Sequence, residues 1–270
     1  MTFEDGLLTL GDGRLLSWRW WGEPGWTPVL RMQGIPASRL QLNPQSTAER
    51  ELRVRYLMAD RPGFGGSTRK KGRGIADVAS DYAELLDAMG LTTVPVIGGS
   101  GGGPHALALA ASRQDRVSAL TIFSGAAPPD VGDPTRGWDE IFDESTTLRE
   151  WLLSDEATQS LPSDAPEVMR TPVFQKMFRE NALEALKQGV EGWTDEVFAL
   201  DHAWDFDPGE VQASVTWWHG DADAIVPLST ARSVVDKMPK ATLQVWRGEG
   251  HFGFLNHERE ILEELLSRSI

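Results

Sequence analysis

The sequence has 270 residues, no cysteine and a formal net charge of −14 at pH 7. Without cysteine, disulfides, thiolate catalysis and cysteine-based zinc sites are excluded, and the acidic balance argues against nucleic-acid partners and anionic membrane surfaces. No apolar stretch reaches the roughly 18 residues that span a bilayer, and the acidic N-terminus lacks the profile of a secretory signal. We therefore expect a cytoplasmic α/β domain, or a core with one inserted subdomain.

Apolar runs typical of strands alternate with helical patterns along most of the chain. The strands are expected at 7–10, 15–21, 28–32, 54–59, 94–97 and 117–125, and at the starts of "SVTWWHGD" and "ATLQVWRGEG". Residues 75–89 place apolar side chains at helical spacing, "PHALALAASR" has its proline in a first turn, and a helix follows each of the last two strands. Continuous apolar strands separated by helices indicate a parallel sheet covered on both faces.

One region interrupts this alternation. Residues 127–212 contain no convincing strand, only helix-like pieces rich in tryptophan, phenylalanine and acidic residues. The region is either an ordinary helical decoration with its own small core or a cap that lines a pocket with aromatic side chains, and both interpretations can hold together. We therefore expect a core formed by residues 1–126 and 213–270, with 127–212 as a helical insertion.

The stretch "GGSGG", which centres on Ser100, matches the pattern G-x-S-x-G. The pattern alone is weak, but an apolar strand leads into it and a helix of small residues follows it. In that setting the serine occupies a sharp strand-to-helix turn, where larger neighbours would collide with the backbone. The amide that follows the serine can then bind a developing oxyanion near the positive end of a helix.

A nucleotide-binding loop is the rival interpretation of these glycines. Gly101, Gly103 and Ala106 fit G-x-G-x-x-A, a dinucleotide-binding pattern. That site needs an acidic residue at the tip of the following strand, but the strand ends in "IFSGA". A P-loop is excluded because no Lys-Ser or Lys-Thr pair follows the glycines. The serine turn is therefore the favoured interpretation.

A serine hydroxyl becomes a good nucleophile when a base takes its proton and a third group orients that base. Of the five histidines, His251 is the candidate base, because it follows the last strand directly in "RGEGHFGF". Asp221 and Asp223 both follow the preceding strand, and spacing alone does not choose between them as the acid. The order serine, acid, histidine is the one expected of an α/β-hydrolase.

The chain resembles the α/β-hydrolase superfamily over nearly its whole length. Four regions carry the resemblance: "MQGIPAS", "DRPGFGGS", "GGSGGG" with its helix, and "HGDADAIVP" followed by "GEGHFGF". The resemblance implies a mostly parallel, doubly wound sheet of eight strands, with the helical insertion after the sixth strand as a cap. It also implies Ser100 as the nucleophile, His251 as the base and Asp223 as the acid.

The resemblance further assigns the oxyanion hole to the backbone amides of Gly101 and Ile35. Gln33 stands where the family commonly has histidine, and it changes the polarity beside the hole. Residues 60–63, Asp-Arg-Pro-Gly, resemble the family's turn after the fourth strand, which we interpret as a structural turn that positions neighbouring loops.

The leading functional hypothesis is a serine hydrolase that cleaves an ester or related acyl bond through an acyl-enzyme, without a metal or organic cofactor. Its partner would be a small molecule, and the aromatic cap suggests an apolar or ring-bearing one. Candidate substrate contacts are Gln33, Trp138, His202 and Trp204. Two alternatives stay open: a lyase, cyclase or acyltransferase that uses the same groups, and a ligand-binding receptor with low turnover.

Overall fold

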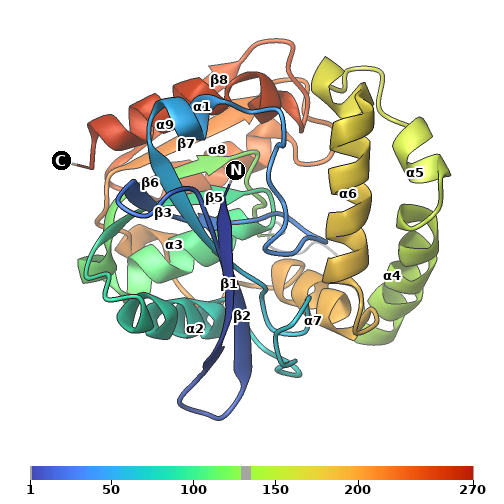
Figure 1. Ribbon diagram of the computed structural model, residues 1–270, viewed down its shortest axis with the longest axis horizontal. Helices are drawn as coiled ribbons and strands as arrows, with labels where there is room; N and C mark the ends of the chain where they lie inside the picture. The colour runs from blue at the N-terminus through green and yellow to red at the C-terminus, as the bar shows by residue number, and fades with distance from the viewer. Residues whose placement is uncertain (1, 129–134, 270) are drawn as a thin grey trace.

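Eight strands form one sheet at the centre of the computed structural model, which describes residues 2–128 and 135–269 (Figure 1). The strands are β1 (Phe3–Thr9), β2 (Leu15–Trp21), β3 (Thr27–Met32), β4 (Val54–Ala59), β5 (Val94–Gly99), β6 (Val117–Phe123), β7 (Val215–Gly220) and β8 (Ala241–Trp246). Their order is β1-β2-β4-β3-β5-β6-β7-β8, and β2 pairs antiparallel with both neighbours while β4, β3 and β5 to β8 run parallel. The expected eight-stranded, mostly parallel sheet is thus confirmed.

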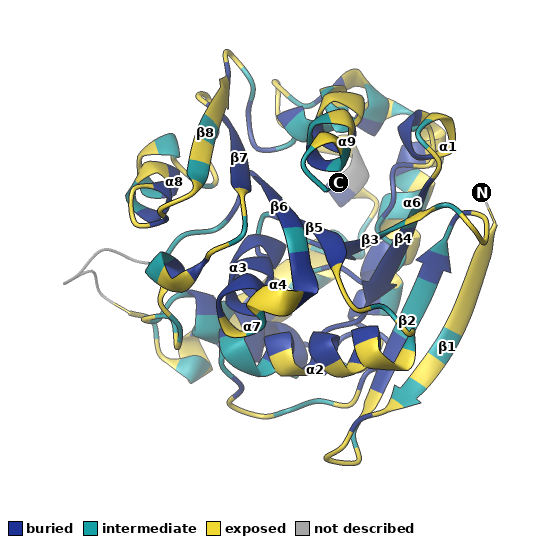
Figure 2. Ribbon diagram, turned by 90° about the vertical axis from the view of Figure 1, so that its left-hand side faces the viewer, coloured by how far each residue is buried: buried dark blue, intermediate teal, exposed yellow. Residues whose placement is uncertain are grey.

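Helices cover both faces of the sheet (Figure 2). One face carries α2 (Ile75–Ala88), α3 (Gly102–Ser112) and α8 (Leu228–Val235), whose apolar side chains form the larger core with the strands. The other face carries α1 (Ala48–Glu51) and α9 (Glu258–Ser267) over a second core. Because both faces are buried, β5 is buried along its whole length, which explains its continuous run of apolar and small residues.

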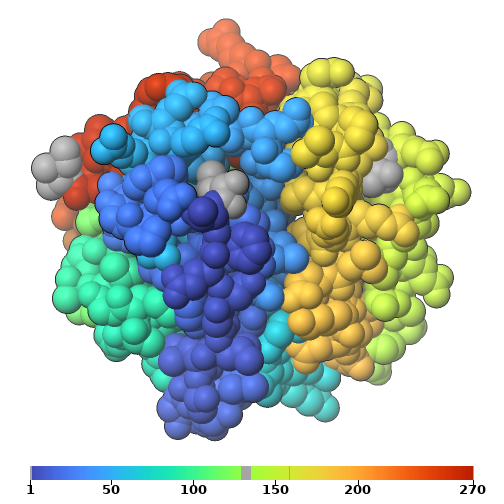
Figure 3. Space-filling model, in the orientation of Figure 1, coloured from blue at the N-terminus to red at the C-terminus, as the bar shows by residue number. Residues whose placement is uncertain are grey.

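Between β6 and β7, the described residues form helices and no strand. They are α4 (Trp138–Leu152), α5 (Glu156–Gln159), α6 (Pro172–Ala185) and α7 (Glu191–Leu200), gathered at one side of the sheet in Figure 1. A small cluster of Phe64, Ala185, Leu186 and Trp193 joins these helices to the loop after β4. In Figure 3, α6 packs directly against the blue N-terminal part of the chain. The expected insertion starts at 127, and its residues 129–134 lie outside the described residues.

Several strand boundaries differ from the prediction, and two of these differences have a clear local reason. The first strand begins at Phe3 rather than at residue 7, because Phe3 pairs across the hairpin with Trp21. The sixth strand ends at Phe123 rather than at 125, because Ser124 has a φ of +45° and turns the chain. None of the helices in the described ranges combines the length and apolar character needed to cross a bilayer.

Candidate active site

Ser100 lies on the sharp turn between β5 and α3. Its φ of +49° is in the left-handed region, which costs a non-glycine residue of the order of 1–3 kcal/mol. The turn also brings two backbone segments into close approach, because a Cβ on Gly102 would lie 2.2 Å from the carbonyl oxygen of Met32. Small residues around Ser100 are therefore required by the packing of the turn against β3.

His251 and Asp223 reach Ser100 from the ends of two other strands. His251 Nε2 lies 3.0 Å from Ser100 Oγ, and His251 Nδ1 lies 2.8 Å from Asp223 Oδ2. Asp221, the alternative acid, accepts a hydrogen bond of 2.7 Å from the Gly248 amide and so belongs to the neighbouring turn. The structure thus brings together the side chains of Ser100, His251 and Asp223, the residues predicted as nucleophile, base and acid.

The Asp223 carboxylate is held by several donors. Its Oδ1 accepts hydrogen bonds from the Ile225 and Val226 amides at 2.9 and 2.8 Å, and His219 Nε2 lies 3.3 Å from its Oδ2. Burial alone would raise the pKa of Asp223, but the hydrogen bonds from His219 and His251 outweigh burial and hold the pKa well below its usual range. The group therefore remains ionised at neutral pH and can stabilise a protonated His251.

The two loops that carry the amides predicted for the oxyanion hole lie beside Ser100. A Cβ on Gly34 would stand 3.3 Å from Ser100 Cβ, and one on Gly101 would stand 3.0 Å from Ile35 Cγ2, so the two loops are in contact. Neither the Ile35 nor the Gly101 amide donates a hydrogen bond to another described residue. Both amides are thus free of competing acceptors among the described residues, as the predicted oxyanion hole requires.

A cavity of about 650 Å³ opens on Ser100 and His251. Its apolar lining includes Ile35, Phe123, Trp193 and Phe254. Trp193 comes from α7, so the helical segment contributes to the cavity. Apolar residues form more than half of the lining, beside the charged Arg31, Arg136, Glu144 and Asp201, and this apolar part suits an apolar ligand.

Gln33, predicted as a substrate contact, also lines this cavity. Its amide group donates a hydrogen bond of 2.7 Å to the Ala59 carbonyl oxygen. Its Oε1 is buried and accepts no hydrogen bond from the described residues. The Nε2 group of Gln33 is therefore bonded to the backbone of β4, whereas its Oε1 has no hydrogen-bond donor among the described residues.

The three other predicted substrate contacts do not line this cavity. Trp138 donates a hydrogen bond of 3.0 Å to Asp195 Oδ1, while His202 Nδ1 bonds to a backbone carbonyl one turn earlier in α7. Trp204 packs against the larger core. The aromatic composition of residues 127–212 predicted a pocket lined by such rings. In the structure these three side chains pack elsewhere, and Trp193 is the tryptophan of this segment that lines the cavity.

A charged group that the sequence analysis missed lies at the cavity wall. Arg31 on β3 lines the cavity and places its guanidinium 5.2 Å from the centre of the Tyr56 ring. Behind it, Glu258 Oε1 is buried and accepts no hydrogen bond from the described residues. Burial raises the pKa of Glu258 to about 7; Arg31 opposes this rise, while Glu49 adds to it. Arg31, Glu49 and Glu258 lie far apart in the sequence, so no local pattern predicts that they meet.

Glu258→Gln is expected to remove a pH dependence of stability. Because the folded pKa of about 7 lies above the ordinary 4.5, wild-type stability from this group is fully present below pH 4.5 and falls by about 3 kcal/mol as the pH rises through 7. Glutamine keeps the acceptor for Asn43 without ionising. Urea unfolding should therefore show that the unfolding free energy of Glu258→Gln, relative to wild type, is higher at pH 8 than at pH 4.5. Glu263→Gln, exposed on the same helix, is the control, and an equal response of both variants would contradict the assignment.

A mostly parallel sheet carrying a serine, a histidine and an aspartate hydrogen-bonded in this order is the arrangement of hydrolases of the α/β type. The sequence model of the alpha/beta hydrolase fold matches residues 27–258. A Caulobacter segnis protein named "Putative carbamate hydrolase RutD" is 34% identical over 251 residues, covering 88% of this chain and 90% of that protein. The chain therefore belongs to the alpha/beta hydrolase family, as its motifs predicted.

One further relative and one solved structure are also similar to this chain. A non-heme chloroperoxidase from Streptomyces lividans is 28% identical over 275 residues, covering 95% of this chain and 96% of that protein. The solved structure of an esterase from Exiguobacterium antarcticum superposes with a TM-score of 0.75 at 21% identity, covering 97% of this chain and 98% of that one. The likeness to the esterase shows the shared fold.

Proposed function

We propose that this enzyme is a serine hydrolase that cleaves an ester or related acyl bond of a small apolar or aromatic molecule. The observation that carries the proposal is the pair of contacts from His251, 3.0 Å to Ser100 Oγ and 2.8 Å to Asp223 Oδ2, at the wall of an apolar cavity. A neutral imidazole held in this way can accept the hydroxyl proton, which a serine alone does not release.

In the proposed mechanism, His251 takes the proton from Ser100 as Oγ attacks the substrate carbonyl. The Ile35 and Gly101 amides donate to the resulting oxyanion, and Asp223 stabilises the imidazolium. His251 then gives its proton to the leaving group, and an acyl-enzyme forms on Ser100. Water, activated by the same histidine, attacks this ester and releases the acid.

We further propose that residues 127–212 act as a cap that sets substrate choice. Trp193 of α7 lines the cavity, and so do Ile141 and Leu148 of α4. These apolar contacts support a preference for apolar acyl or leaving groups. The names of the relatives add carbamates and esters as the bond types to test first.

Labelling with a fluorophosphonate tests this proposal directly. We expect one adduct per chain, mapped to Ser100, and steady turnover in a panel of p-nitrophenyl esters, lactones, carbamates and amides. His251→Ala should slow the labelling strongly, because the hydroxyl loses its base. Absence of labelling would overturn the proposal. Labelling with tight ligand binding but negligible product release would favour the receptor alternative.

A further inference from the structure

One buried arginine holds the peptide that carries the oxyanion donor of Ile35. The carbonyl of that peptide belongs to Gly34, and it accepts a hydrogen bond of 2.9 Å from Arg61 Nη2. Arg61 Nη1 donates to the preceding carbonyl, that of Gln33, at 2.6 Å. A single guanidinium therefore fixes two successive carbonyl groups directly before Ile35.

These contacts determine the direction and the strength of the Ile35 donor. A peptide unit is planar, so fixing the Gly34 carbonyl also fixes the direction of the Ile35 N–H on the opposite side of the same plane. A charge-assisted bond to the carbonyl polarises the peptide and makes its N–H a better donor. Arg61 is completely buried, so solvent does not weaken this effect.

Arg61 is itself anchored by a carboxylate from α7. Its Nε lies 2.8 Å from Glu196 Oε1, His105 Nε2 lies 2.9 Å from the same oxygen, and Arg73 Nη2 pairs with Glu196 Oε2. All four side chains are buried. Burial alone would raise the pKa of Glu196, but Arg61, Arg73 and His105 together hold it well below its usual range. The anchor therefore stays charged at neutral pH.

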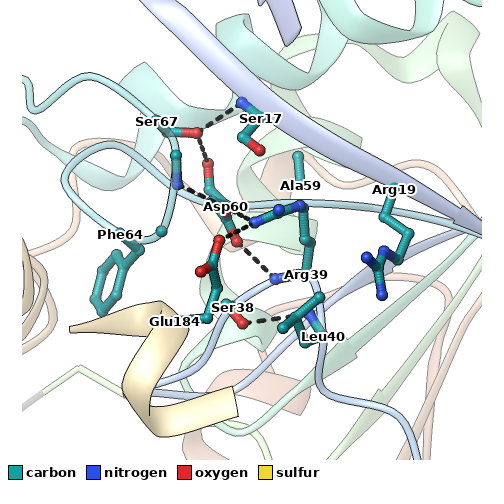
Figure 4. A network of polar contacts seen from close by, with 12 residues as sticks. Ser17, Arg19, Ser38, Arg39, Leu40, Ala59, Asp60, Phe64, Ser67 and Glu184 are labelled. Carbon is teal, nitrogen blue, oxygen red and sulfur yellow. Dashed lines mark hydrogen bonds and ion pairs between the residues drawn. The ribbon is translucent and has the colours of Figure 1, made fainter. Parts of the chain in front are cut away.

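A second network fixes the same loop at Arg39, a few residues further along the chain (Figure 4). Asp60 Oδ1 accepts a hydrogen bond of 2.6 Å from the Arg39 amide, and Asp60 Oδ2 one of 2.6 Å from Arg39 Nη1. Arg39 Nη1 also donates to Glu184 of α6 at 2.6 Å. The loop after β3 is thus held at its start by Arg61 and at Arg39 by Asp60, and Arg61 is the group that contacts the peptide before Ile35.

We propose that Arg61 is a positioning residue for the oxyanion hole: held by Glu196 of α7, it orients and polarises the peptide between Gly34 and Ile35. The proposal rests on the proposed function, because it concerns the second donor of that hole. It also makes specific the interpretation of the Asp-Arg-Pro-Gly turn at 60–63 as a turn that positions neighbouring loops.

Arg61→Lys tests this proposal, with Arg73→Lys as the matched control. Lysine keeps the charge but offers one ammonium in place of three nitrogens that face two carbonyls and Glu196. We expect kcat on a p-nitrophenyl ester to fall by about 10- to 100-fold with KM within about twofold, because the loss falls on the transition state. Affinity for a trifluoromethyl ketone, whose adduct on Ser100 carries an oxyanion, should fall by the same factor as kcat/KM. Arg73 pairs with the same carboxylate but touches neither carbonyl, so Arg73→Lys should change each value by less than about threefold.

Equal losses in the two variants, or an unchanged ketone affinity in Arg61→Lys, would overturn the proposal. If Arg61→Lys does not fold, Glu196→Gln gives the second test. It removes the charge that anchors Arg61, and kcat and ketone affinity should fall together by about 3- to 10-fold; unchanged values would again overturn the proposal. Fluorophosphonate labelling of wild-type Ser100 separates a failure of the proposed function from a failure of the Arg61 proposal. If the wild type is not labelled, the hydrolase mechanism is rejected. If it is labelled but Arg61→Lys leaves kcat and ketone affinity unchanged, only the role of Arg61 is rejected.

Discussion

Ser100→Ala is expected to lower kcat for a short p-nitrophenyl ester by about 10⁶-fold and leave the protein folded. Removing Oγ removes the atom that bonds to the acyl group, and His251 is left with no hydroxyl to deprotonate. The residual rate should come from the cavity and the two amides alone. Stopped assays at high enzyme concentration, with active sites counted by fluorophosphonate in the wild type, measure the ratio.

Ser100→Gly gives a control that separates chemistry from stability. Glycine adopts the φ of +49° without the strain of a side chain, so this variant should be inactive and about 1 kcal/mol more stable than Ser100→Ala. Thermal unfolding of both variants checks the difference. Turnover retained by either variant at more than about 1% of the wild-type rate would remove Ser100 from the mechanism.

Asp223→Asn is expected to lower kcat by about 10⁴-fold. The Asn carbonyl can still accept from the Ile225 and Val226 amides, which leaves its NH₂ group facing His251 Nδ1. That contact favours the imidazole tautomer with its proton on Nε2, which cannot accept the proton of Ser100. Steady-state kinetics at pH 8 give the ratio, and KM should change little.

Asp221→Asn is the matched control for this prediction. Asp221 lies two residues away on the same loop and accepts a hydrogen bond from Gly248 rather than from His251. Its kcat should stay within about twofold of the wild type. Comparable losses in the two variants would mean that the loop, and not the Asp223 carboxylate, is what matters.

Asp223→Asn should also change the stability of the protein in acid. The folded pKa of Asp223 is depressed, so its contribution is present above the ordinary value of 3.8 and is lost as the pH falls toward the folded pKa. Asp223→Asn lacks this loss, and its unfolding free energy should fall less steeply than that of the wild type below pH 4.

Periodicity and turn residues predicted the sheet well, because most strands are short apolar runs that end in glycine or a polar turn, whereas the polar start of β1 (Phe3–Thr9) was missed. The helix at 75–89 and the turn at Ser100 are local features in the same sense, since neighbouring residues dictate them. The four-residue helix α1 was not expected, because it has too few turns to give a periodic pattern.

The lining of the cavity could not be predicted in the same way. The sequence does not show which of Trp138, Trp193 and Trp204 lines the cavity. Only the packing of α4 and α7 places Trp193 in the lining and turns Trp138 toward Asp195. Arg61 escaped notice as a positioning residue because its partners, Gly34 and Glu196, lie far away along the chain. Such roles depend on long-range contacts, for which a single sequence carries no spacing signal.

The position of the helical segment has a consequence for protein engineering. Strands β6 and β7 are neighbours in the sheet, so a chimera that exchanges the segment between them would leave the strand pairing intact. However, the graft would have to supply an acidic residue at the place of Glu196. Without it the guanidinium of Arg61 would be buried with no counter-ion, at a cost of about 3–5 kcal/mol.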